Sequence, residues 1–273
     1  MSLVSTEWLN KNHSKVKIID ASWHMPNANR NAYEEYKTQH ISNAIFFDID
    51  KFSNQKTDLP HMLPKEKEWE KILSNLGISN EDRIIVYDNS DVISSCRCWY
   101  SFIFFGHDPN LVSVLDGGLI KWKNENREIT NKTFNYEKKN YKAKKIVNLV
   151  KTKDEINKNI LKKKFKVVDA RSKNRFLGLE KEPRPGLKSG SIQDSYCLPF
   201  GELINLNNRT FLEKNLIKEK FLQIGITNEN NIVFSCGSGI TATVLSLAYS
   251  LINDKYLPSI YDGSWTEYGK IKQ

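Results

Sequence analysis

Two stretches of this chain are near copies of each other and decide its fold: Val16-Lys-Ile-Ile-Asp-Ala-Ser22 returns as Phe165-Lys-Val-Val-Asp-Ala-Arg171. Three ordered matches at nearly one spacing, about 148 residues, indicate a duplicated domain. The other two matches pair Ile84-Ile-Val-Tyr-Asp88 with Ile232-Val-Phe-Ser-Cys236, and Val114-Leu-Asp-Gly-Gly118 with Ile260-Tyr-Asp-Gly-Ser264.

Each copy has a pattern of alternating strands and helices. Short runs rich in Val and Ile predict buried parallel strands, and helical patterns such as Glu66–Leu76, which ends at Gly77, follow them. This alternation predicts an α/β fold of two tandem domains, each a mainly parallel β-sheet flanked by helices. We expect the domains at residues 1–135 and 149–273, joined by a Lys-rich linker at 136–148. The later strands are expected at Arg83–Tyr87, Leu111–Leu115, Asn231–Ser235 and Leu257–Tyr261.

Composition and charge narrow the class of protein. The 273 residues are 39% hydrophobic and 27% charged, which is typical of a folded globular chain. No apolar run approaches the ~18 residues of a membrane span, and the first residues lack secretory signal features, so we expect a cytoplasmic protein without a membrane partner. The net charge of +9 permits a nucleic-acid partner. However, the densest basic cluster, Leu161–Lys166, is interpreted as a solvated helix end, and no nucleic-acid motif accompanies it.

The four cysteines indicate neither a disulfide framework nor a metal site. Cys96 and Cys98 are too close for a zinc knuckle, and no second pair matches them. Cys236 differs, because it ends a strand and is followed by Gly-Ser-Gly-Ile-Thr and an apolar helix pattern. Gly237 and Gly239 let the backbone turn tightly with its N–H groups facing inward, and these groups and the helix dipole favour an anion. This context predicts a sulfur nucleophile; the alternative is a small buried cysteine at a strand end.

The stretch Cys236-Gly-Ser-Gly-Ile-Thr241 resembles the active-site loop of 3-mercaptopyruvate sulfurtransferases, which are tandem-domain members of the rhodanese family. The resemblance covers nearly the whole chain. Asp88 stands where the N-terminal domain of that family has lost its nucleophile. The other segments that resemble family signatures are Phe46-Phe-Asp-Ile-Asp50, His61-Met-Leu-Pro64, Leu115-Asp-Gly-Gly-Leu119 and Tyr261-Asp-Gly-Ser-Trp265.

The resemblance implies a cysteine persulfide mechanism. Cys236 would attack the sulfur of 3-mercaptopyruvate, pyruvate would leave, and the sulfur would pass to a thiol acceptor such as thioredoxin, or to cyanide. It implies no cofactor and no metal. The loop residues Gly237, Gly239, Ile240 and Thr241 would bind the donor, although Ile240 replaces the usual Val.

The resemblance also implies a cationic clamp and a proton relay. Arg175 and Arg184 match substrate-binding arginines, and a guanidinium can hold a carboxylate by two hydrogen bonds. Ser238, His61 and Asp50 would form the relay, with Asp50 orienting His61. The alternatives are two surface arginines in a charged loop and a structural histidine, while the neighbouring Asp48 could take the part of Asp50. For Arg171 we expect a structural ion pair.

Two other functions stay open from the sequence. The first is a thiosulfate:cyanide sulfurtransferase, but Gly237 and Ser238 lack the basic side chains that suit a doubly charged donor. The second is a non-catalytic module that carries persulfide or binds a partner, which the intact loop opposes. Phosphatase chemistry is disfavoured because Thr241-Ala-Thr243 contains no arginine to clamp a phosphate.

Overall fold

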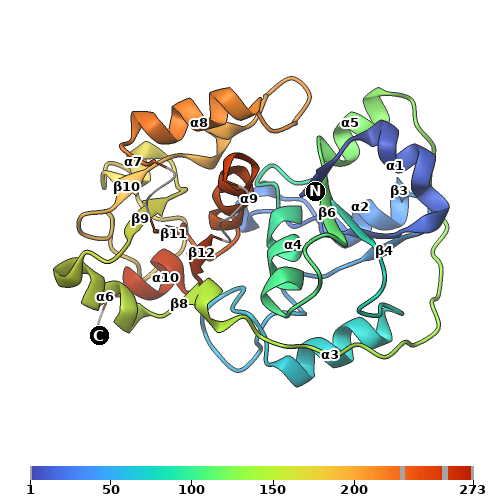
Figure 1. The fold of residues 1–273 in the computed structure, drawn as a ribbon, viewed down its shortest axis with the longest axis horizontal. Helices are drawn as coiled ribbons and strands as arrows, with labels where there is room; N and C mark the ends of the chain where they lie inside the picture. The colour runs from blue at the N-terminus through green and yellow to red at the C-terminus, as the bar shows by residue number, and fades with distance from the viewer. Residues whose placement is uncertain (1, 228–230, 254–257, 272–273) are drawn as a thin grey trace. The chain divides into compact units, whose positions relative to one another are not determined.

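A computed structural model describes residues 2–227, 231–253 and 258–271 of the chain (Figure 1). The chain forms two compact units, and each takes a short segment from the other half of the sequence. Unit 1 contains the residues up to Gln55, Leu63–Ile146 and Leu206–Thr210. Unit 2 contains Lys56–Met62, Val147–Asn205 and the residues from Phe211 on.

Unit 1 is built on a five-stranded parallel sheet with the order β1-β6-β5-β2-β4. Unit 1 also contains a separate two-stranded antiparallel ribbon of β3 and β7. The strands are β1 Leu3–Val4, β2 Lys17–Asp20, β3 His40–Ile41, β4 Ala44–Phe46, β5 Ile84–Tyr87, β6 Val112–Leu115 and β7 Ile129–Thr130. The helices are α1 Thr6–Asn12, α2 Ala32–Thr38, α3 Glu66–Asn75, α4 Ser95–Phe104 and α5 Gly118–Asn124, with 3-10 turns η1 His13–Lys15 and η2 Pro26–Ala28.

Unit 2 repeats this architecture. Its sheet has the order β10-β9-β11-β12-β8, again parallel throughout, so that each strand has a counterpart at the same place in unit 1. The strands are β8 Val150–Lys151, β9 Lys166–Asp169, β10 Tyr196–Cys197, β11 Ile232–Ser235 and β12 Ser259–Tyr261. The helices are α6 Lys153–Lys162, α7 Lys173–Phe176, α8 Lys214–Gln223, α9 Ala242–Ile252 and α10 Ser264–Tyr268, with 3-10 turns η3 Val147–Leu149 and η4 Phe200–Leu203.

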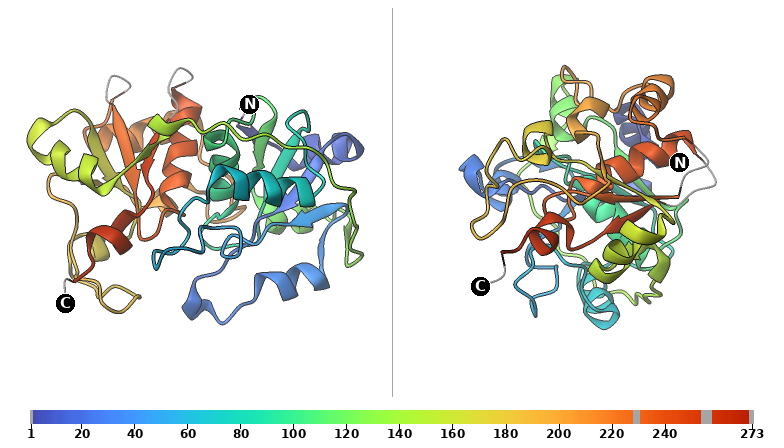
Figure 2. Two further views of the ribbon diagram at one scale, coloured as in Figure 1. Left: turned by 90° about the horizontal axis from the view of Figure 1, so that it is seen from below. Right: turned by 90° about the vertical axis from the view of Figure 1, so that its left-hand side faces the viewer.

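The expected α/β fold with two tandem domains is therefore present, and Figure 2 shows helices on both faces of each sheet. The central strands β5 and β11 are buried along their whole length, which agrees with their unbroken apolar runs. Helix α3 ends next to Gly77, whose φ of 68° lies in the left-handed region, as the sequence predicted. Leu257, the predicted start of the last strand, lies outside the described residues.

Part of the predicted linker packs closely on unit 1. Tyr141 is 1% exposed, and its ring stacks on that of His107 with 5.9 Å between the centroids. Lys144 and Ile146 donate backbone hydrogen bonds to Phe105 and Phe104 at the end of α4. The boundaries expected from the sequence remain a prediction. By contrast, the basic cluster at 161–166 does lie where α6 ends, and Leu161 is exposed.

No helix within the described ranges is both long enough and apolar enough to cross a bilayer.

Candidate active site

Cys236 lies at the carboxyl end of the central strand of unit 2. Strand β11 ends at Ser235, which pairs with Asp169 at the end of β9, so the residues that follow both strands share one edge of the sheet. The Cys236 loop, residues 236–241, connects β11 to α9. The thiol is fully buried, and the Gly239 N–H donates a hydrogen bond to its Sγ at 3.1 Å. Gly239 has a φ of 81°, which a side chain would strain.

Residues of helix α10 form hydrogen bonds with the backbone of Cys236. The N–H of Cys236 donates to the Ser264 Oγ at 3.1 Å, and the N–H of Trp265 donates to the Cys236 carbonyl at 2.9 Å. Thr266 likewise donates to the carbonyl of Gly237. The backbone of Cys236 and Gly237 is thus fixed by three hydrogen bonds with the first residues of α10.

Sequence reasoning missed Ser264, although the repeat contained a signal. Ser264 has a φ of 48°, and Gly118, at the matching place in unit 1, has a φ of 53°. A serine in this left-handed conformation costs free energy that glycine does not pay. The Ser264 Oγ accepts from Cys236 and donates to the Tyr261 carbonyl at 2.7 Å. The comparison of Gly118 with Ser264 could have identified this position.

Arg175 lies against the Cys236 loop. An ideal Cβ built on Gly237 would be 3.3 Å from the Arg175 Nη2, so the guanidinium occupies space that a side chain at 237 would need. Glu182 holds this guanidinium by two hydrogen bonds, at 3.2 Å to Nε and 2.6 Å to Nη2. Arg175 is therefore oriented toward the residue that follows Cys236. Glu182 was not predicted from the sequence.

Arg171 forms the structural ion pair that was expected of it. Its guanidinium binds Asp169 at 2.7 Å and Glu182 at 2.7 Å, and lies 4.5 Å from the centre of the Trp265 ring. Burial disfavours its charge, but the two carboxylates outweigh burial and hold the pKa of Arg171 above its usual range. Asp169, Arg171, Glu182 and Arg175 thus form one chain of ion pairs, called here the charge cluster.

Arg184 has a different environment from Arg175. It lines a cavity of about 1380 Å³ in unit 2 together with Leu59, Pro60 and Lys188. None of the residues of the Cys236 loop lines this cavity. The structure therefore brings Arg175 to the Cys236 loop, and the role of Arg184 stays a prediction.

His61 meets the Cys236 loop through Ser238, and both residues belong to unit 2. The Nδ1 of His61 lies 3.0 Å from the Ser238 Oγ and 3.3 Å from the Ser238 carbonyl oxygen, and both side chains are buried. Asp50 belongs to unit 1, where its Oδ2 accepts from the Trp23 Nε1 at 2.9 Å. Asp48 accepts from the backbone N–H of Lys51 and so caps a turn.

The remaining predicted loop residues pack around this site. Ile240 is 3% exposed, and Thr241 immediately precedes α9. The Ile240 carbonyl accepts hydrogen bonds from the N–H and the hydroxyl of Thr243, which closes the loop onto the first turn of the helix.

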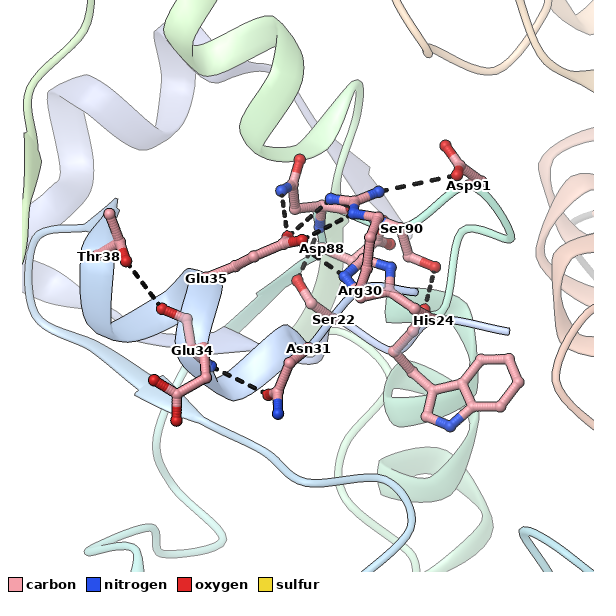
Figure 3. Close-up of polar contacts among 12 residues, drawn as sticks. Ser22, His24, Arg30, Asn31, Glu34, Glu35, Thr38, Asp88, Ser90 and Asp91 are labelled. Carbon is pink, nitrogen blue, oxygen red and sulfur yellow. Dashed lines mark hydrogen bonds and ion pairs between the residues drawn. The ribbon is translucent and has the colours of Figure 1, made fainter. Parts of the chain in front are cut away.

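Unit 1 has a carboxylate at the place of the thiol. Asp88 follows β5, and its two oxygens accept from the N–H groups of Ser90 and Ser95 at 2.8 and 2.9 Å. Burial raises the pKa of Asp88 above its usual range. Figure 3 shows this loop with Arg30, which pairs with Glu35 and reaches toward Asp91. This loop thus keeps the backbone geometry of an anion site and fills it with its own side chain.

Metal ligands do not gather anywhere in the part of the chain that the structure describes: no group of three His, Cys, Asp or Glu residues there could hold a metal ion. Cys96 and Cys98 are buried in α4, and burial raises the pKa of each thiol. Cys197 is half-buried, and burial raises its pKa to about 11. Each of these three thiols is therefore disfavoured as a thiolate at neutral pH.

Comparison of the sequence with models of protein families shows the family of this chain. The model of the rhodanese-like domain matches residues 5–125 and again residues 152–270. This chain belongs to the rhodanese family. Both matches fall on the duplicated units, so the resemblance inferred from the Cys236 loop is confirmed for nearly the whole chain.

Individual rhodanese relatives agree with this assignment. The mitochondrial thiosulfate/3-mercaptopyruvate sulfurtransferase 1 of Arabidopsis thaliana is 37% identical over 97% of this chain and 75% of its own length. The 3-mercaptopyruvate sulfurtransferase of Mus musculus is 35% identical over 98% of this chain and 91% of its own length. The crystal structure of SseA from Escherichia coli, named as a 3-mercaptopyruvate sulfotransferase, superposes with a TM-score of 0.87 at 28% identity, over 97% of this chain and 99% of that one. These relatives confirm the predicted class of enzyme, a sulfurtransferase.

Proposed function

We propose that this chain is a 3-mercaptopyruvate sulfurtransferase that works through a persulfide on Cys236. The observation that carries the proposal is the environment of the Cys236 Sγ: it is fully buried, it accepts the Gly239 N–H at 3.1 Å, and its loop bears no charged side chain. Backbone amides fixed in advance stabilise an anionic sulfur without needing to reorganise. Such a site suits a donor that brings a single negative charge.

The reaction balances without a cofactor. The Cys236 thiolate forms an S–S bond with the sulfur of 3-mercaptopyruvate, and the C–S bond of the donor breaks. Its electron pair stays on carbon, which gives the enolate of pyruvate. That carbon takes up one proton, equivalent to the one that the donor thiol loses, and pyruvate leaves. An acceptor thiol then takes the outer sulfur and restores the Cys236 thiolate.

Three side chains support these steps. The Arg175 guanidinium, held against Gly237, would bind the donor carboxylate by two hydrogen bonds. Ser238 and His61, whose Oγ and Nδ1 lie 3.0 Å apart, would carry the proton between the donor thiol and the enolate carbon. Asp50 would orient His61, and Arg184 would bind the donor as a second cation. These two roles follow from the resemblance alone.

The acceptor and the place of the reaction are also part of the proposal. Thioredoxin or another small dithiol is the acceptor that the resemblance implies, and we expect the reaction in the cytoplasm. The Arabidopsis thaliana relative is named as mitochondrial, so fractionation of the native host should test that expectation. We further propose that the functional division of the chain follows residues 1–135, 136–148 and 149–273.

The competing donor is thiosulfate, since the Mus musculus thiosulfate sulfurtransferase is also 33% identical to this chain. The test is pyruvate release from 3-mercaptopyruvate with dithiothreitol, run beside thiocyanate formation from thiosulfate and cyanide. Cys236→Ser should abolish pyruvate release, whereas Cys197→Ser, which removes a thiol from the same edge of the sheet, should leave it unchanged. Turnover of thiosulfate alone would instead make this chain a thiosulfate sulfurtransferase, and no turnover with either donor would favour a carrier module.

A further inference from the structure

Glu182 is the central member of the charge cluster. Its side chain is 2% exposed and receives hydrogen bonds from two arginines, Arg171 at 2.7 Å and Arg175 at 2.6 Å. Arg171 already has a second carboxylate, Asp169. Arg175 has a side chain 17% exposed, and Glu182 is the carboxylate that pairs with it. Removal of the Glu182 charge would therefore chiefly affect the positive charge of Arg175, which would lose its paired carboxylate.

The charges of the cluster sum to zero, with two carboxylates facing two guanidinium groups. This sum matters for catalysis because the Arg175 guanidinium lies against Gly237, the residue next to Cys236. The Glu182 carboxylate accepts from the Nη2 atom of that guanidinium at 2.6 Å and from its Nε at 3.2 Å. A donor that binds Arg175 beside Cys236 would therefore be attracted by the guanidinium and repelled by the Glu182 carboxylate paired with it.

Unit 1 offers an internal comparison, because it has a similar arginine–glutamate pair beside a loop without a thiol. Glu35 accepts from Arg30 through both of its oxygens, at 2.7 Å each (Figure 3). It also accepts from the side-chain amide of Asn89 at 2.9 Å. Asn89 occupies the place that Gly237 has in unit 2. There the loop side chain donates to the glutamate of the pair, whereas Gly237 has no side chain and lies against Arg175 directly.

From this arrangement we infer that Glu182 determines the charge of the donor: it selects singly charged over doubly charged sulfur donors by cancelling most of the positive charge of Arg175. The inference rests on the proposed function, because it concerns the choice between 3-mercaptopyruvate and thiosulfate at Cys236. The single carboxylate of 3-mercaptopyruvate can use the directional hydrogen bonds of the guanidinium. Thiosulfate, with two charges, depends more strongly on positive potential, which Glu182 lowers.

The decisive variant is Glu182→Gln, which keeps the shape and one acceptor oxygen but removes the charge. One additional net positive charge attracts a dianion about twice as strongly as a monoanion. We expect the ratio of kcat/KM for thiosulfate to that for 3-mercaptopyruvate to rise about fivefold in the purified full chain. The increase should shrink in high salt, because ions screen a partly exposed site.

The matched control is Glu180→Gln. Glu180 is exposed and only two residues away, and its carboxylate lies 3.5 Å from the Ser172 hydroxyl. The substitution changes the net charge of the chain equally, and the donor ratio should stay within about twofold of wild type. An equal rise in Glu180→Gln and Glu182→Gln would overturn the inference, because overall charge would then explain it.

A second variant keeps the test decisive if Glu182→Gln does not fold. Glu182→Asp retains the charge but shortens the side chain, so both donors should bind less well while their ratio changes by less than about twofold. A ratio in Glu182→Asp that rises fivefold contradicts a role for charge and assigns Glu182 a structural part only.

Binding separates this inference from the proposed function. Isothermal titration should give dissociation constants for sulfate, a dianion, and pyruvate, a monoanion, with wild type and Glu182→Gln. A relative gain for sulfate in the variant supports the inference even if 3-mercaptopyruvate is not turned over, in which case only the proposed function fails. Unchanged relative affinities overturn the inference even if pyruvate release is fast.

Discussion

The Nδ1 atom of His61 lies 3.0 Å from the Oγ of Ser238, although 177 residues separate them in the sequence. The His61 backbone adopts a φ of 62° to present its ring there, a conformation that non-glycine residues seldom take. Both side chains are buried, so water competes little for this contact. Backbone strain of this kind is often found at functional sites.

The first prediction concerns this contact. His61→Asn tolerates the left-handed backbone and can still bond to Ser238, but it cannot carry a proton. We expect kcat for pyruvate release to fall about 100-fold with KM changed less than about threefold. His107→Asn is the control, because His107 is another buried histidine that packs on Tyr141 in unit 1; it should lower the melting temperature and spare kcat. A His61→Asn variant with wild-type kcat would remove His61 from the mechanism.

Arg175 should control donor binding through its fork of N–H groups. Arg175→Lys keeps the charge but loses the paired hydrogen bonds to a carboxylate, so kcat/KM for 3-mercaptopyruvate should fall about 100-fold, mainly through KM. Steady-state kinetics measure both constants. Arg30→Lys breaks the comparable pair with Glu35 in unit 1 and should leave the kinetics unchanged. Equal losses in the two variants would indicate general destabilisation.

Ser264 should show opposing effects of strain and hydrogen bonding. Ser264→Ala keeps the strained φ of 48° and leaves the buried N–H of Cys236 without its acceptor, which should lower the free energy of unfolding by about 1–3 kcal/mol. Ser264→Gly also loses the acceptor but relieves the strain, so it should be more stable than Ser264→Ala by about 1 kcal/mol. Urea unfolding compares the two variants. An alanine variant as stable as the glycine variant would contradict this account.

Asp20 should make unit 1 less stable as the pH rises. Its burial raises the pKa to about 6 from its usual 3.8, although hydrogen bonds from Ser22 oppose the shift. Ser22 stands where unit 2 has Arg171, so Asp20 lacks the cation that Asp169 has. Because the folded state holds the proton more tightly than the unfolded state, stability falls between about pH 4 and pH 6 and is then constant.

The variant Asp20→Asn tests this pH dependence. The asparagine has no proton to lose. The free energy of unfolding of the variant minus that of wild type should therefore increase by about 2–3 kcal/mol from pH 4 to pH 7. Urea unfolding of both proteins at several pH values gives this difference. The titration of all other groups cancels because it is the same in the two proteins. A difference that does not change with pH would mean that Asp20 titrates normally in the folded protein.

The sequence was sufficient for the sheets and for the position of Cys236 at the end of a central strand. Buried parallel strands are continuous apolar runs. The runs that predicted these strands end at or just before Asp20, Asp169 and Cys236. The duplication predicted one shared topology for the two domains, and the two sheets have corresponding strand orders. Local pattern and global fold agree in these segments.

Other features depend on tertiary contacts that no local pattern encodes. Glu182 looks like an exposed loop acid in the sequence, and only the return of the loop onto Arg171 and Arg175 buries it. The positive φ of Ser264 is equally invisible unless Gly118 is compared with it. Arg184 matched a family motif, yet it lines a cavity to which the Cys236 loop does not contribute.

The exchange of short segments has a consequence for dividing the chain. His61 comes from the first half of the sequence and meets Ser238 in unit 2, while Arg209 comes from the second half and donates to the Ser90 carbonyl in unit 1 at 2.6 Å. These two residues hold corresponding places, with φ values of 62° and 64°. If the chain is cut at residue 148, the first fragment carries the segment Lys56–Met62 of unit 2, and the second carries the segment Leu206–Thr210 of unit 1. Neither fragment should therefore be active alone. Mixing the two fragments should restore activity by complementation.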